Sequence, residues 1–113
     1  MFTRNETMES DQREHISAVI NYFWGEGTTA PESVNQDMAS IAYEALEEAQ
    51  SCSAAMDFVP RPISGRPSGK YIIKQVAKIG KRIASGDTQL YETCRQRVAI
   101  NFRNQMEMAK QGL

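Results

Sequence analysis

The sequence has few of the residues that usually make a chemical site recognisable. It contains one histidine and only two cysteines, Cys52 and Cys94, which lie far apart. A zinc site needs paired ligands at short spacing, and a disulfide framework needs more cysteines. We therefore expect no metal, no cofactor and two buried free thiols, as is usual in a reducing compartment.

Long hydrophobic runs are also missing. The richest apolar stretch, residues 16–24, is interrupted by Ser17 and Asn21, and the first six residues lack the apolar segment of a secretory signal. The sequence therefore predicts a soluble, cytoplasmic protein that does not bind membranes.

Recognisable catalytic patterns are equally scarce. Asp11 precedes His15 by one helical turn, but no nearby nucleophile or second titrating group would complete an acid-base site, so a surface pair is favoured. Glu44, Glu47 and Glu48 have no accompanying Glu-x-x-His motif and are interpreted as a solvated or salt-bridged acidic face. Residues 65–71 differ from a phosphate-binding P-loop in glycine spacing and in the residue after the lysine. We predict that the protein is not an enzyme.

What the sequence does contain is apolar spacing by threes and fours, which predicts helices. Helices are expected at about 10–24, 30–56, 68–85 and 88–111. Prolines and glycines exclude a helix from 57–69, which is expected to be a loop. The prediction is an all-α, four-helix bundle-like single domain spanning 1–113. The short break at Gly86 and Asp87 predicts that the third and fourth helices form an antiparallel pair.

Charge is distributed very unevenly along the chain. Residues 1–57 hold eleven acidic and two basic residues, whereas residues 58–86 hold seven basic residues and no acidic one. In the third predicted helix the lysines fall opposite the apolar side, which makes the helix basic and amphipathic. The candidate partner-binding residues are Arg61, Arg66, Lys70, Lys74, Lys78, Lys81 and Arg82.

This basic stretch is compatible with several interpretations. Its lysines could pair with the acidic half of the same chain or of a second copy, contact the acidic face of another protein, or neutralise nucleic-acid phosphates. The overall pI of about 5.8 and the lack of a base-reading helix-turn-helix pattern weaken the nucleic-acid interpretation. We therefore predict a small binding or regulatory protein that acts through charge-complementary protein contacts, including those of a homodimer. Nucleic-acid binding is the alternative, and a helical enzyme comes third.

Overall fold

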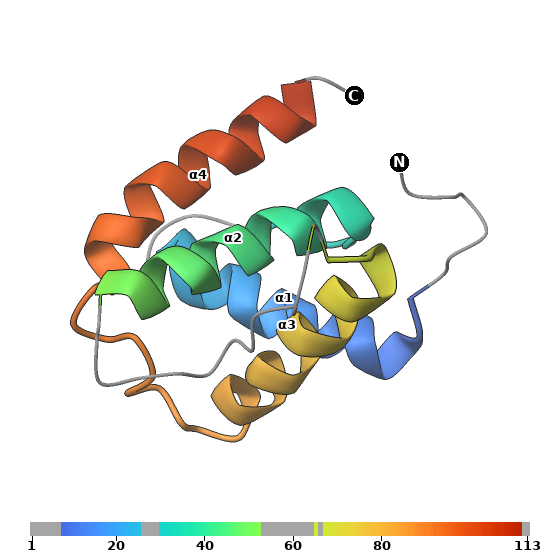
Figure 1. Ribbon diagram of the computed structural model, residues 1–113, viewed down its shortest axis with the longest axis horizontal. Helices are drawn as coiled ribbons and strands as arrows, with labels where there is room; N and C mark the ends of the chain where they lie inside the picture. The colour runs from blue at the N-terminus through green and yellow to red at the C-terminus, as the bar shows by residue number, and fades with distance from the viewer. Residues whose placement is uncertain (1–7, 26–29, 53–64, 66, 112–113) are drawn as a thin grey trace.

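Four helices and parts of their connections make up the described part of the computed structural model, which comprises residues 8–25, 30–52, 65 and 67–111. In chain order the helices are α1 (Ser10–Trp24), α2 (Gln36–Cys52), α3 (Gly69–Ala84) and α4 (Arg95–Gln111). They pack against one another into a bundle-like globule (Figure 1). The prediction of an all-α fold is confirmed. Most of the predicted loop 57–69 lies outside the described residues.

The first and third helices have nearly the predicted bounds, because local signals define their ends. The Ser68 side chain accepts a hydrogen bond from the Tyr71 backbone N–H and so caps the start of α3. Beyond the last turn of α3, Gly86 adopts a φ of 103°, and the backbone N–H groups of Gly86 and Asp87 donate to the carbonyls of Ile83 and Arg82. This is a Schellman motif, as the glycine at position 86 predicts.

The second helix begins six residues later than predicted. The Asn35 side chain accepts a hydrogen bond of 2.9 Å from the Met38 backbone N–H, which makes Asn35 the cap of α2. Residues 30–35 precede the helix as irregular chain, so the predicted start at residue 30 is wrong. The predicted extension over 53–56 lies outside the described residues.

The fourth helix begins at Arg95, and the predicted start at residue 88 is wrong. Residues 88–94 form turns, and Tyr91 has a left-handed φ of 58°, which interrupts any helix. Leu90, Tyr91 and Cys94 are nevertheless almost fully buried. The spacing of these three residues in the sequence resembles that of a helix because their side chains are buried, although the backbone forms turns.

The packing of the helices also differs from the prediction. α3 packs mainly against α1 and also on α2, whereas α4 packs on α2 and α1 and does not contact α3. The predicted antiparallel pair of α3 and α4 is therefore wrong. The ten-residue connection 85–94 carries the chain from α3 to the other side of the bundle (Figure 1).

One hydrophobic core joins all four helices. Its fully buried side chains include Ile16 and Phe23 of α1, Leu46 of α2, Ile79 of α3 and Phe102 of α4. Phe102 lies against the rings of both Phe23 and Trp24. Within the described ranges, no helix has both the length and the apolarity needed to cross a membrane.

Candidate functional site

The predicted basic surface is present on α3 as four exposed side chains. Lys70, Lys74, Lys78 and Lys81, which we call the lysine face, all lie on the solvent side of the helix. The opposite side of α3 is buried through Ile72, Val76, Ile79 and Ile83.

The remaining candidate residues do not extend this surface in the described structure. Arg82 is only partly exposed, and its guanidinium forms a 2.7 Å ion pair with Asp87. Its charge is therefore partly neutralised beside the cap of α3. Arg61 and Arg66 lie outside the described residues.

The lysine face has no acidic partner among the described residues. Three ion pairs are formed among the described residues, and each joins residues close in sequence: Arg82 with Asp87, Arg95 with Glu92, and Lys110 with Glu107. None of the three joins α3 to α1 or α2. The described part of the structure thus contains none of the pairing between these lysines and the acidic half of the chain that the charge distribution suggested.

The lysine face also works against the stability of its own helix. Lys70, Lys74 and Lys78 follow one another at i,i+4 spacing, and each like-charge pair at that spacing costs about 0.2–0.5 kcal/mol. Lys70 also lies in the first turn of α3, which contains no acidic residue and where the helix dipole disfavours a cation. The arrangement is therefore not explained by the stability of α3.

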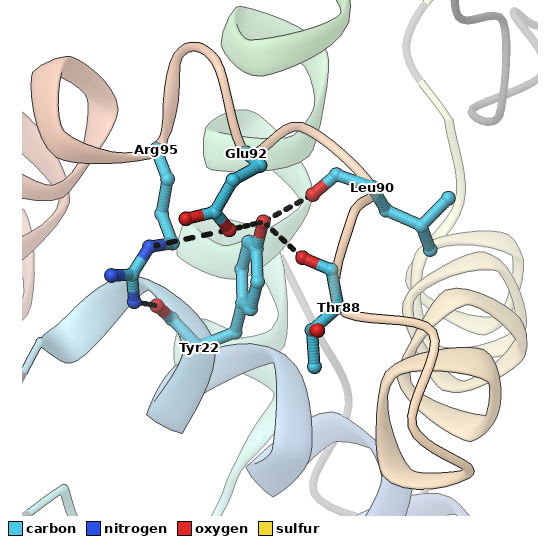
Figure 2. Close-up of polar contacts among 5 residues, drawn as sticks. All are labelled: Tyr22, Thr88, Leu90, Glu92 and Arg95. Carbon is cyan, nitrogen blue, oxygen red and sulfur yellow. Dashed lines mark hydrogen bonds and ion pairs between the residues drawn. The ribbon is translucent and has the colours of Figure 1, made fainter.

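A second polar cluster, which the sequence did not indicate, surrounds Tyr22 near the end of α1. The Tyr22 hydroxyl donates a hydrogen bond to the Leu90 carbonyl and lies 3.3 Å from both the Thr88 carbonyl and Glu92 Oε2 (Figure 2). Arg95 Nη1 donates to the Tyr22 carbonyl at 3.1 Å, and its guanidinium lies 5.3 Å from the centre of the Tyr22 ring.

The contacts of the Tyr22 cluster have a structural role. Burial raises the pKa of the Tyr22 phenol well above its ordinary value, and the negative charge of Glu92 raises it further. A phenol with a raised pKa stays protonated and donates, so it is unsuited to act as a base near neutral pH. Its hydrogen bond instead ties the 85–94 connection to α1.

Arg95 also lines a surface hollow of about 450 Å³. The described residues that line it are Gly25, Arg95, Gln96, Ala99, Ile100 and Arg103. Two guanidinium groups give it a positive lining. The same two arginines lie near the end of α1, which has no basic residue in its last turn. Arg95 donates to the Tyr22 carbonyl, and a Cβ atom at Gly25 would lie 3.7 Å from the Arg103 guanidinium. Arg95 therefore contacts the negative end of α1 directly, whereas the Nε of Arg103 donates to the Ala99 carbonyl of its own helix.

The other candidates from the sequence stay apart. His15 is half-buried where α1 meets α3, and it forms neither a hydrogen bond nor an ion pair with Asp11, so the predicted surface pair is not formed. In the acidic cluster, Glu48 accepts a hydrogen bond from the Asn101 side chain across the α2–α4 interface. Among the described residues, no three potential ligands from His, Cys, Asp and Glu come together in a metal-binding group.

The two cysteines contradict the sequence-based expectation of free thiols. Cys52 at the end of α2 and Cys94 just before α4 form a disulfide bond with their Cα atoms 6.1 Å apart. Cys52 is exposed, whereas Cys94 is 1% exposed. The prediction failed because the cysteines are separated by 42 positions, and only the packing of α4 on α2 brings them together.

Comparisons with protein families, with curated proteins and with solved structures find no match to this chain.

Proposed function

We propose that this protein is a small binding protein whose lysine face docks onto an acidic protein surface, either on another protein or on a second copy of itself. The observation that supports the proposal is that four exposed lysines repel one another along α3 and have no ion-pair partner among the described residues. An acidic partner would relieve that repulsion and would steer the association.

A second copy is a suitable partner because of the acidic half of the chain. Exposed carboxylates occur on both α1 and α2, at Asp11, Glu14, Asp37 and Glu44. A dimer formed in this way repeats the same contact twice when it has twofold symmetry. Its affinity should decrease as salt concentration rises, because exposed charges are screened.

Location in the cytoplasm and the absence of catalysis are parts of the same proposal. In a cytosolic protein a disulfide between Cys52 and Cys94 would be exposed to reducing thiols, and the disulfides that occur there are usually transient or redox-sensing.

The experiment compares two variants of equal net charge. In the first, Lys70, Lys74 and Lys78 are changed to Gln; in the matched control, the exposed residues Arg13, Arg97 and Lys110 are changed to Gln. Light scattering at low and physiological salt measures self-association, and titration with a glutamate-rich peptide measures binding of an acidic partner. We expect the lysine-face variant to weaken one of these associations by at least about tenfold, and the control to retain both.

Mixed-sequence DNA and RNA provide the competing test. We expect no retention in filter binding at micromolar protein, because the acidic half of the chain repels phosphate. Tight retention with a steep salt slope, reduced in the lysine-face variant, would instead establish nucleic-acid binding. A monomer that binds neither the acidic peptide nor nucleic acid would show that the lysine face is only a solvated surface.

A further inference from the structure

The two sulfurs of the Cys52–Cys94 disulfide lie in very different surroundings. Cys52 is the last residue of α2 and is exposed, whereas Cys94, the last residue of the turn that precedes α4, is 1% exposed. An incoming thiolate must approach the sulfur that it attacks, so access selects Cys52.

One electrostatic feature lies beside each sulfur of the bond. Arg97 Nη1 lies 3.8 Å from Cys52 Sγ, where it attracts an anionic thiolate. Cys94 directly precedes Arg95, the first residue of α4. The Cys94 carbonyl accepts the first helical hydrogen bond, which the Val98 N–H donates. The positive end of α4 therefore offsets part of the cost of placing a thiolate on the buried Cys94 sulfur, which allows Cys94 to act as the leaving group.

We propose that Cys52 is a site of reversible S-thiolation by a small-molecule thiol such as glutathione, and that Cys94 is the sulfur that leaves and later returns. In the first step the thiolate attacks Cys52 Sγ, a new S–S bond forms there, and the electron pair of the broken bond goes to Cys94 Sγ. Attack by the Cys94 thiolate on the modified Cys52 reverses the step and expels the small thiol. Alternatively, a second small thiolate attacks the small thiol's sulfur in the mixed disulfide. This step releases Cys52 as a free thiol together with a small-molecule disulfide, and the protein has then been reduced by two electrons.

This reaction would control how α4 is held. The disulfide joins the end of α2 to the start of α4, and α4 makes no contact with α3. Opening the bond therefore removes the covalent link between α2 and α4 and leaves α4 held by its apolar packing and by the hydrogen bonds of Arg95 and Asn101. S-thiolation at Cys52 also adds a bulky charged group beside Arg97.

The experiment begins with the full-length wild-type protein purified without reductant. Denatured samples are first assayed for free thiols, and we expect none. Native protein is then given limiting reduced glutathione, quenched with acid, alkylated and mapped by peptide mass spectrometry. We expect the mixed disulfide on Cys52 and the alkylated free thiol on Cys94. Glutathione on Cys94, or two free thiols in the starting protein, would overturn the proposal.

Variants make the test independent of the wild-type bond. Oxidised glutathione should modify Cys52 in the Cys94→Ser protein at least about tenfold faster than it modifies Cys94 in the Cys52→Ser protein, and urea should abolish that difference because it exposes both thiols. Circular dichroism establishes that each variant is folded. Equal native rates would contradict the proposal.

Arg97 provides a finer test of the charge argument. Arg97→Gln should slow attack on the wild-type bond by about two- to fivefold, in keeping with the modest strength of exposed charge interactions. Arg103→Gln, a charge-matched change elsewhere on α4, should leave the rate unchanged. Equal effects of the two substitutions would show that Arg97 does not guide the thiolate and would remove that part of the proposal.

Discussion

Gly80 of α3 lies directly against the backbone carbonyl of His15 in α1, so closely that a Cβ atom at position 80 would overlap that oxygen. The absent side chain allows α3 to pack more extensively on α1 than any other two helices pack on each other in the described structure. The lysine face on the outer side of α3 therefore belongs to the helix with the most extensive helix–helix contact in the described structure.

Gly80→Ala should destabilise the protein by at least about 2 kcal/mol, because the atom that must give way belongs to the backbone of α1. Gly86→Ala is the comparison. Position 86 has open space around it but a φ of 103°, so the cost there should be only about 1–2 kcal/mol of backbone strain. Urea unfolding measures both values. A Gly80→Ala protein as stable as wild type would mean that α1 and α3 do not approach so closely.

Tyr22→Phe should cost about 1–2 kcal/mol, because it removes the hydrogen bond to the Leu90 carbonyl and leaves that group unsatisfied. The pKa of Tyr22 is raised in the folded state, whereas an unfolded tyrosine loses its proton at about pH 10. The stability that this phenol contributes is therefore fully present below about pH 10 and is lost as pH rises further. Unfolding curves of both proteins at pH 8 to 11 should converge at the alkaline end; a constant difference would argue against the raised pKa.

Lys74→Glu should stabilise the protein by roughly 1 kcal/mol. It replaces two like-charge contacts, with Lys70 and Lys78, by two attractive pairs at the same i,i+4 spacing. The same change should weaken binding to an acidic partner, so stability and binding would move in opposite directions. Thermal unfolding at low salt measures the first effect, and high salt should reduce it. A loss of stability would show that Lys74 has a favourable contact in the folded protein.

Two side chains of α4 that are two positions apart in the sequence should differ sharply in how much stability their substitution costs. Phe102 is 2% exposed and packs on Phe23 and Trp24, so Phe102→Ala should cost about 3–5 kcal/mol. Ile100 is 64% exposed, and Ile100→Ser should change stability by less than about 0.5 kcal/mol. If Ile100→Ser changes the mass measured by light scattering, then this side chain belongs to an interface between copies.

Reduction of the disulfide should lower the free energy of unfolding by up to about 4 kcal/mol, the chain-entropy value for a closed loop of this length. Urea unfolding with and without a strong dithiol reductant measures the difference. The Cys52→Ser protein should match the reduced wild-type protein and should not respond to reductant. If wild type were equally unresponsive, the bond would not be contributing to stability.

The amino-acid sequence determined the features of this protein that depend on neighbours along the chain. Helical periodicity and the local hydrogen bonds of Ser68 and Gly86 define α3 and its solvent-facing lysines, because every interaction involved spans only a few residues. Only the tertiary structure decided the start of α4, the partner helices of α3 and the cysteine pairing. The Tyr22 hydroxyl reaches the Leu90 carbonyl across 68 positions, and Cys52 reaches Cys94 across 42. Contacts at such separations form only when the whole core packs, since the closure of each long loop costs entropy that no local pattern repays.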